Sequence, residues 1–264
     1  MDAIPLLGVN LALIGAVFAG LWTLAQINRD PSFVDAFWAF GITLLAVSSF
    51  VLGGGWEPRK ALIAGLVLLW GLRLGVHLFL RWRREGADRR YEALLSGARE
   101  KRSWSYGRTT ALFIFAPQAV LLWIAALPAQ LGQVSPEPGF SALAWIGAGL
   151  AVFGLAFESL ADLQLQRFKA DARNEGAVMD QGLWAWSRHP NYFGEAATWW
   201  GIWLIAADTP AGLFAVIGPV FVTFTLVKWS GAPMLERGLK KSRPGYARYV
   251  ERTSPFIPWP PKRS

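Results

Sequence analysis

The sequence has no cysteine and only two histidines among its 264 residues. The missing cysteines exclude disulfides, thiolate metal sites and cysteine nucleophiles. His77 and His189 are far apart in the chain, and no carboxylate cluster has metal-ligand spacing, so we expect no metal. No Gly-x-Gly-x-x-Gly follows a strand and no serine lies in a hydrolase elbow, which argues against a soluble dinucleotide fold and that hydrolase class.

Charged residues are also scarce, at 17% of the chain, whereas hydrophobic residues make up 53% and the mean hydropathy is +0.32. Apolar windows long enough to cross a bilayer recur along the sequence. We expect seven spans, at 4–26, 33–52, 61–80, 109–131, 142–161, 191–207 and 210–229. The sequence therefore predicts an all-α polytopic membrane protein, a seven-helix bundle that forms one membrane-embedded domain over residues 1–264.

The net charge of +8 is distributed unevenly over the expected loops. With the N-terminus outside, nearly all of the 26 Lys and Arg residues fall on one side of the membrane, and the loop between spans four and five has none. The positive-inside rule then places the large loops and the C-terminus in the cytoplasm. The basic excess is explained by contact with anionic membrane lipids, so nucleic acid is not an expected partner.

A polar cluster lies where the sixth apolar segment begins. It contains Arg188, His189, Asn191, Tyr192 and Glu195, with a proline at 190 that can start a helix. The first amides of a helix favour an anion, and a carboxylate one turn inside an apolar segment needs a partner or a ligand. The cluster predicts a site for an anionic cofactor; the alternative is that Arg188 and His189 are interfacial anchors.

Ionisable residues inside expected spans form a second candidate set, because such residues are rare in membranes. Asp35 lies early in the second span, and Arg73 and His77 share one face of the third. An ion pair between Asp35 and Arg73 would neutralise both charges. Whether these three residues have a packing role or a catalytic one stays open at this point.

Further polar residues are expected at the cytoplasmic ends of the spans. Asp162 and Lys169 are spaced to lie on one helix stripe, which predicts that the fifth helix continues past the membrane. Several arginines could join Arg188 and His189 in a phosphate pocket, although each could instead meet lipid phosphates. These arginines are Arg81, Arg83, Arg84, Arg89, Arg90 and Arg173.

The segment 182–195, Gly-Leu-Trp-Ala-Trp-Ser-Arg-His-Pro-Asn-Tyr-Phe-Gly-Glu, carries a family resemblance together with the tail. The tail contains Gly-Ala-Pro-Met-Leu-Glu at 231–236, Gly-Tyr at 245–246, Tyr249 and Thr-Ser-Pro-Phe-Ile-Pro at 253–258. These motifs resemble the C-terminal region of the steroid 5α-reductase superfamily, and within it the bacterial DUF1295 branch. The resemblance is weaker over the first four spans.

The resemblance implies an NADPH-dependent oxidoreductase acting on a CH–CH group, which reduces an activated C=C bond in a lipophilic enone, as steroid Δ4-3-ketone reductases do. It implies a multi-pass protein of the bacterial inner membrane, with the active site facing the cytoplasm and a small-molecule substrate entering from the bilayer. Residues 1–131 would form the substrate-cavity half and 142–264 the cofactor-binding half.

The resemblance also assigns residues. Asn191 and Glu195 match a cofactor-binding Asn-x-x-Gly-Glu motif, and Asp162 and Lys169 match polar residues of the preceding helix. Arg73 matches a basic residue of the third span. Glu236, Tyr246 and Tyr249 belong to the matching tail and are expected near the cofactor.

The sequence departs from the steroid reductases at the group that activates the carbonyl. Trp70 aligns with a tyrosine of the third span, and Asp35 is the only second-span carboxylate. His77 and Tyr91 are alternatives for the missing phenol. The motif Arg-His-Pro-x-Tyr also resembles membrane methyltransferases that act on isoprenylcysteine or phospholipid with S-adenosylmethionine, which is the rival interpretation.

Overall fold

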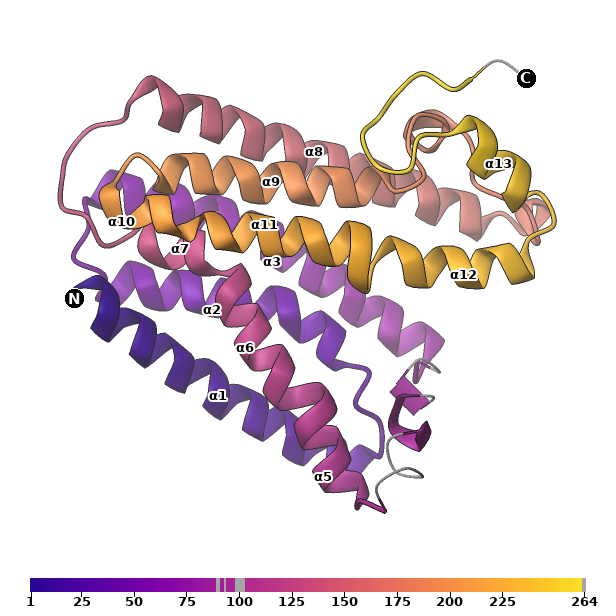
Figure 1. The fold of residues 1–264 in the computed structure, drawn as a ribbon, viewed down its shortest axis with the longest axis horizontal. Coiled ribbons are helices and arrows are strands. Elements are labelled where there is room, and N and C mark those ends of the chain that lie inside the picture. Colours follow the sequence, from indigo (N-terminus) through magenta and orange to yellow (C-terminus); the bar gives the residue numbers. More distant parts are fainter. Residues whose placement is uncertain (89–90, 93, 98–102, 263–264) are drawn as a thin grey trace. The chain divides into compact units, whose positions relative to one another are not determined.

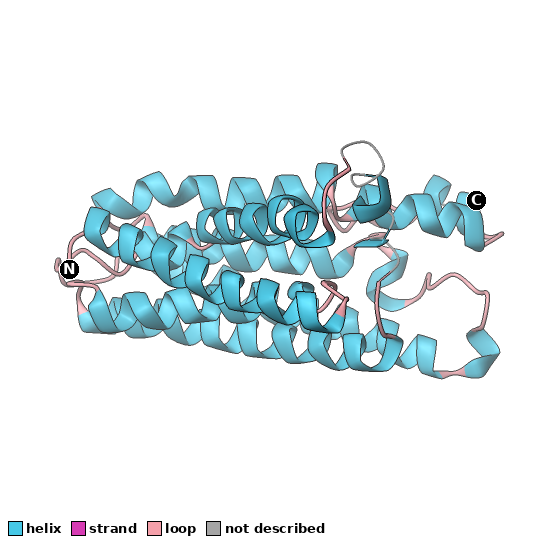
Figure 2. Cartoon of the chain, turned by 90° about the horizontal axis from the view of Figure 1, so that it is seen from below, coloured by secondary structure: helices cyan, strands magenta, loops and turns pink. Residues whose placement is uncertain are grey.

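The structure is a computed structural model that describes every residue except 89–90, 93, 98–102 and 263–264. The described chain consists of helices joined by loops and turns (Figure 2). Long apolar helices are the expected solution in a bilayer, because a helix satisfies its own backbone hydrogen bonds where no water is present. The all-α class predicted from the sequence is confirmed for the described part of the chain.

The chain folds into two compact units. The first unit contains Met1–Phe140 and Ala206–Gly218, and the second contains Ser141–Ile205 and Pro219–Ser264. The main boundary lies between the two predicted halves, but the short segment that follows the sixth apolar helix belongs to the first unit. Each unit is compact by itself, and the single membrane-embedded domain stays a prediction.

The first unit is built on three long helices: α1 (Ala3–Asn28), α2 (Val34–Leu52) and α3 (Glu57–Glu85) (Figure 1). Helix α2 packs closely along α3. The close approach depends on small residues: a Cβ at Gly75 would lie 2.6 Å from the ring of Phe40. Small residues of this kind let apolar helices pack in lipid, where no hydrophobic force drives them together.

The fourth apolar segment is interrupted. It divides into α5 (Tyr106–Thr110), a π-helical stretch (Ala111–Phe115), α6 (Ala116–Ala125) and α7 (Leu127–Leu131). A proline at the start of α7 explains the last break, because it cannot donate to the preceding turn. The short helices α10 (Pro210–Leu213) and η4 (Phe214–Val216) complete the first unit.

Side-chain hydrogen bonds join the helices of the first unit inside its apolar core. The Asn10 amide donates to Ser49 Oγ at 2.9 Å and to Gln130 Oε1 at 3.0 Å, and all three residues are fully buried. These bonds connect α1, α2 and α7.

The second unit contains α8 (Ala142–Ala170), α9 (Pro190–Ala206) and most of α11 (Ile217–Phe224). After α11 the chain continues through a π-helical stretch (Thr225–Trp229) into α12 (Ala232–Ser242) and α13 (Tyr246–Arg252). Short 3₁₀ helices at Ala172–Asn174 and Gly182–Ala185 lie in the connector between α8 and α9. Helix α8 continues to Ala170, beyond the predicted span at 142–161, as the helical spacing of Asp162 and Lys169 indicated.

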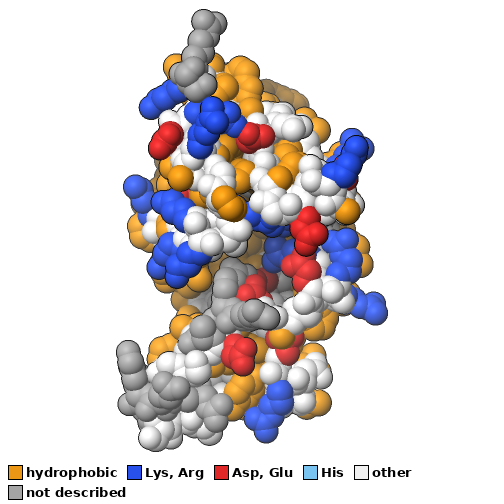
Figure 3. Space-filling model, turned by 90° about the vertical axis from the view of Figure 1, so that its right-hand side faces the viewer, with side chains coloured by type: hydrophobic (Ala, Val, Ile, Leu, Met, Phe, Trp, Pro, Cys, Tyr) orange, Lys and Arg blue, Asp and Glu red, His pale blue; other side chains and the backbone are white. Residues whose placement is uncertain are grey.

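In the part of the chain that the structure describes, six helical stretches are long and apolar enough to cross a membrane, the last of them running over Pro210–Ser242. The protein is therefore a multi-pass membrane protein. Helix α9 matches the sixth predicted span but has 17 residues, which is about 25 Å and short for a span. The count of seven spans and the orientation remain predictions. The face shown in Figure 3, at the right-hand side of Figure 1, carries many Lys and Arg side chains.

Candidate active site

Helices α8 and α9 of the second unit meet along a seam of glycines. A Cβ at Gly194 would lie 2.5 Å from the Glu158 amide nitrogen, and one at Gly154 would lie 2.6 Å from the Gly194 carbonyl oxygen. Nearer the other end, a Cβ at Gly147 would lie 2.7 Å from the Gly201 carbonyl oxygen. The two backbones are thus in direct contact, which fixes the residues of α9 opposite those of α8.

The seam ends where two predicted site residues meet. The Asn191 amide, in the first turn of α9, donates to Asp162 Oδ1 on α8 at 3.2 Å. Glu195 follows Asn191 by four residues and is half-buried on the same face of α9. Lys169 is exposed near the end of α8. The structure thus brings together Asn191, Glu195 and Asp162, and Lys169 lies two turns further along α8.

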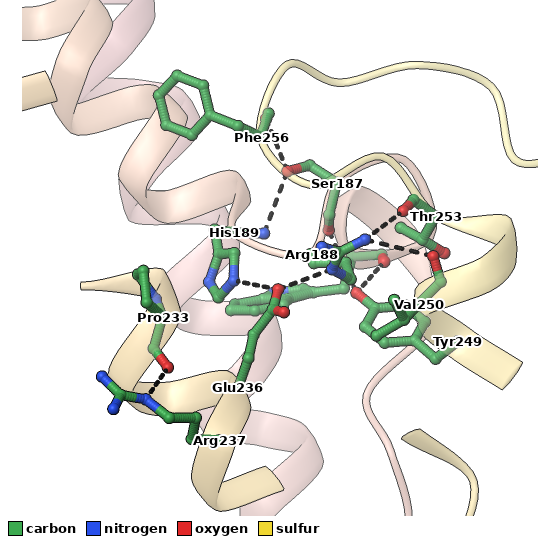
Figure 4. Close-up of polar contacts among 11 residues, drawn as sticks. Ser187, Arg188, His189, Pro233, Glu236, Arg237, Tyr249, Val250, Thr253 and Phe256 are labelled. Carbon is green, nitrogen blue, oxygen red and sulfur yellow. Dashed lines mark hydrogen bonds and ion pairs between the residues drawn. The ribbon is translucent and has the colours of Figure 1, made fainter. Parts of the chain in front are cut away.

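Arg188 lies just before α9 and binds three other segments (Figure 4). Its Nε donates to Glu236 Oε1 of α12 at 2.8 Å, and its Nη1 donates to the carbonyl oxygens of Thr253 at 3.0 Å and Val250 at 3.3 Å. Its backbone amide also donates to the Ser254 carbonyl oxygen at 2.8 Å. The guanidinium charge is therefore compensated by Glu236 and used to hold the tail.

His189 shares the same carboxylate. Its Nε2 lies 3.0 Å from Glu236 Oε1, and its ring stacks on Tyr192 with centroids 5.3 Å apart. Burial lowers the pKa of His189 because it disfavours the charged ring, and nearby Arg188 acts in the same direction, while Glu236 opposes both. A neutral imidazole that donates through Nε2 fits this arrangement. Neither Arg188 nor His189 then offers an uncompensated positive charge to a phosphate.

The two tail tyrosines of α13 are both buried but differ in their contacts. The Tyr249 hydroxyl donates to the Trp184 carbonyl oxygen at 2.6 Å and lies 3.2 Å from that of Ser187. The Tyr246 hydroxyl lies beside the Arg188 side chain, which can only donate to it, and finds no acceptor for its own proton among the described residues. Burial, with a further contribution from Glu236, raises the pKa of Tyr246 to about 12, and burial also raises the pKa of Tyr249. Tyr246 is therefore a protonated donor available to a ligand.

Of the predicted arginines, Arg173 takes no part in this cluster, and those of α3 belong to the other unit. Arg173 is exposed and forms an ion pair with Asp171 at 2.6 Å, which lowers the pKa of that carboxyl. Arg84 is exposed at the end of α3 in the first unit. Arg89 and Arg90 lie outside the described residues. Within the second unit, the expected cluster of arginines is therefore limited to Arg188 itself among the described candidates.

Several contacts of the cluster had no signal in the sequence. The Ser187 hydroxyl donates to the Phe256 carbonyl oxygen at 2.7 Å and accepts from the His189 amide at 3.1 Å. The Trp184 indole donates to the Ala161 carbonyl oxygen at 3.0 Å. Backbone carbonyls are present at every residue, so a residue pattern does not reveal which of them a side chain will use.

The first unit contains a pocket of about 300 Å³ at the start of α2 and the end of α3. Its polar lining consists of Ser32, Asp35, Arg81, Trp82, Glu85 and Asp88. Asp35 accepts a hydrogen bond from the Tyr91 hydroxyl. The Gln118 amide nitrogen donates to the same hydroxyl at 3.4 Å. Its carbonyl oxygen accepts a hydrogen bond from the Trp38 indole at 2.8 Å.

Arg73 and His77 are half-buried on α3 and do not belong to the pocket lining, which begins on α3 at Leu78. Trp70 is almost fully buried. The structure therefore places Asp35 beside Tyr91, one of the two alternatives for the missing phenol. Within the described residues, no group of three or more His, Asp and Glu side chains is arranged to hold a metal ion.

Comparison with known proteins identifies the family. Residues 21–253 match the family described as "Protein of unknown function (DUF1295)", and the chain belongs to it. The chain is also similar to the uncharacterized protein C594.04c of Schizosaccharomyces pombe, with 24% identity over 270 residues that cover 90% of this chain and 75% of the yeast protein. No solved structure matches.

Proposed function

We propose that the protein is an NADPH-dependent membrane oxidoreductase that reduces the activated C=C bond of a lipophilic enone. The observation that carries the proposal is the contact of Asn191 with Asp162 at the start of α9, with Glu195 one turn further along. These residues were assigned to the cofactor by resemblance to the steroid 5α-reductase superfamily. The family assignment to DUF1295 is consistent with that resemblance.

The residues of the second unit fit a dinucleotide by their donor and acceptor chemistry. Asn191 uses one amide hydrogen on Asp162, which leaves its second N–H and its carbonyl oxygen for a ligand. The buried Tyr246 hydroxyl needs an acceptor, and a ligand would supply one. Carboxylates such as Glu195 and Asp162 suit ribose hydroxyls, and Lys169 suits a phosphate.

Arg188 and His189 have a different proposed role from the one expected. Both are bound to Glu236, and Arg188 also binds tail carbonyls, so they hold α12 and the tail in place around the site. Their removal would act through the position of Tyr246 and the tail. We therefore propose that they are positioning residues.

The Tyr91–Asp35 pair of the first unit is the proposed carbonyl-activating group. A phenol hydroxyl can donate to a carbonyl oxygen on which negative charge develops, and Asp35 orients that hydroxyl. Trp70 is buried in the core, and an indole does not transfer a proton as a phenol does. When bound, NADPH would supply a hydride to the β-carbon of the enone. The α-carbon would then take up a proton from water.

Ligand-induced thermal stabilisation of the detergent-purified protein tests the cofactor, because a ligand stabilises the state that it binds. NADPH is expected to raise the melting temperature. Stabilisation by S-adenosylhomocysteine and not by NADPH would instead identify a methyltransferase, and no response to either would argue against both enzymes.

The residue assignment is tested by Asn191→Ala. We expect about a tenfold loss of NADPH affinity, which corresponds to one hydrogen bond of about 1.4 kcal/mol. Asn174→Ala is the matched control, because Asn174 lies in the connector and its amide donates to the Phe168 carbonyl oxygen of α8, not to a proposed cofactor residue. Equal NADPH affinity in Asn191→Ala and the wild type would contradict the assignment. Tyr91→Phe should keep NADPH affinity but lose enone-dependent NADPH oxidation.

A further inference from the structure

Aromatic rings form a continuous row in the second unit, from the membrane-spanning part of α8 to the C-terminal tail. Phe153 contacts Phe157 with ring centroids 5.4 Å apart, and Phe157 contacts Phe193 of α9 at 5.5 Å. Phe193 contacts Phe256 of the tail at 5.9 Å. The row therefore connects the tail directly to two apolar helices.

The row also places the tail in relation to the bilayer. Helix α8 has 29 residues, whereas about 20 are enough to cross the hydrocarbon core. Counted from its start at Ala142, the crossing ends near Ala161, so Phe157 lies close to the membrane boundary. Phe256 is joined to Phe157 through Phe193, which puts the tail at the same level.

Next to Phe256, the tail exposes large apolar side chains. Ile257 is 63% exposed and Trp259 is 70% exposed. Trp186 of the connector is 47% exposed, and its carbonyl oxygen accepts from the Trp259 amide at 3.0 Å. Helix α8 also exposes apolar side chains, for example Val152 at 55%, as expected of a helix that faces lipid.

We propose that residues 256–259 are an interfacial membrane anchor that inserts Ile257 and Trp259 into the adjacent leaflet. Tryptophan and isoleucine suit this boundary, because an indole favours the headgroup level and an aliphatic side chain favours the acyl chains. Lys262 follows the segment, and its charge suits anionic headgroups. Prolines at 255, 258, 260 and 261 keep this stretch out of a helix.

The anchor has a structural consequence for the candidate site. The carbonyl oxygens of Thr253, Ser254 and Phe256 accept hydrogen bonds from Arg188 and Ser187, so the anchored segment directly adjoins that cluster. The leaflet then helps to hold the tail in its place beside this cluster. This inference concerns the tail alone and does not depend on the proposed reductase activity.

The absence of cysteine permits a direct test by spin labelling. Ile257→Cys and Trp259→Cys are labelled in the full-length protein and reconstituted in bilayers of equal parts phosphatidylcholine and phosphatidylglycerol. Accessibility to oxygen, which partitions into lipid, is compared with accessibility to a water-soluble nickel complex. We expect both labels to favour oxygen, whereas a label at the exposed Glu175→Cys of the connector favours the nickel complex.

Labels at 257 and 259 that match the Glu175→Cys label would overturn the anchor, because the tail would then lie in water. Labels shielded from both reagents would overturn it too, since they would show a protein partner on this surface. Each variant keeps the other apolar residue, so neither removes the whole anchor. Both positions are exposed, so the substitutions leave the core packing of the second unit intact.

Discussion

Arg188 shows how one residue can organise a site without binding a ligand. It follows the connector, precedes α9 and reaches both α12 and the tail, so one side chain joins four segments of the second unit. A buried ion pair of this kind contributes little net stability, but loss of one partner leaves an uncompensated charge. The Arg188–Glu236 ion pair instead fixes the positions of Tyr246 and the tail.

The two tail tyrosines provide a matched pair of substitutions. Tyr249→Phe loses the hydrogen bond to Trp184, which should destabilise the protein by about 1 kcal/mol. Tyr246→Phe removes a buried hydroxyl that has no acceptor in the described chain and only the Arg188 side chain beside it, so its melting temperature should fall less than that of Tyr249→Phe. If Tyr246 contacts NADPH, its variant should lose affinity while keeping stability. Thermal unfolding with and without NADPH measures both effects.

His189 predicts a pH dependence of stability. Its folded-state pKa is lowered, so below the ordinary value of about 6.5 the unfolded chain binds a proton more readily than the folded protein. Stability should therefore decrease as the pH falls through that value. The decrease should be smaller in His189→Gln, which keeps a donor but does not titrate. Melting temperatures over a pH series test this, and equal slopes for both proteins would refute it.

At the scale of elements, the seam between α8 and α9 gives a sharp prediction. Gly154→Ala places a Cβ against the Gly194 carbonyl oxygen and the Thr198 hydroxyl, at 2.6 and 2.7 Å, so the helices must separate. We expect a loss of about 1–3 kcal/mol, as for other overpacked sites. Gly149→Ala on the same helix meets nothing within 4 Å and should be neutral or stabilising. Equal melting temperatures for the two variants would mean that the seam is not close-packed.

The elements were largely predictable because hydrophobic length is a local property of the sequence. The windows at 4–26, 33–52 and 142–161 match α1, α2 and the first part of α8. The window at 109–131 is divided by a π-helical stretch and a proline, which hydropathy does not register. The hydropathy windows end at Trp229 and do not include helix α12, because that helix is amphipathic rather than apolar.

The candidate site was predictable in its residues and less so in its contacts. Asn191 and Asp162 were expected in one site, and they meet through the glycine seam. Arg188 was expected to bind an anionic cofactor, which stays a prediction; the contacts that its guanidinium makes with Glu236 and backbone carbonyls were not predicted. The sequence contains the charges of both partners, but only the fold decides which charges compensate each other.

At the scale of the whole molecule, the number of spans decides the sides on which the termini lie. Seven spans place them on opposite sides, whereas the six long helical stretches alone place them on the same side. Asp2→Cys and Lys262→Cys can be labelled separately with an impermeant maleimide in intact and permeabilised cells. We expect Asp2→Cys to react in intact cells and Lys262→Cys only after permeabilisation. Reaction of both in intact cells would refute the seven-span topology.

Arg188 binds the C-terminal segment through main-chain atoms of that segment, and this has a consequence for which substitutions are tolerated. The acceptors at Val250, Thr253 and Ser254 are backbone carbonyls, which every amino acid provides. Substitutions at these three positions therefore leave the acceptors in place, as long as Arg188 and the length of the chain around them persist. Tails with different residues at these positions can still form the same hydrogen bonds with Arg188.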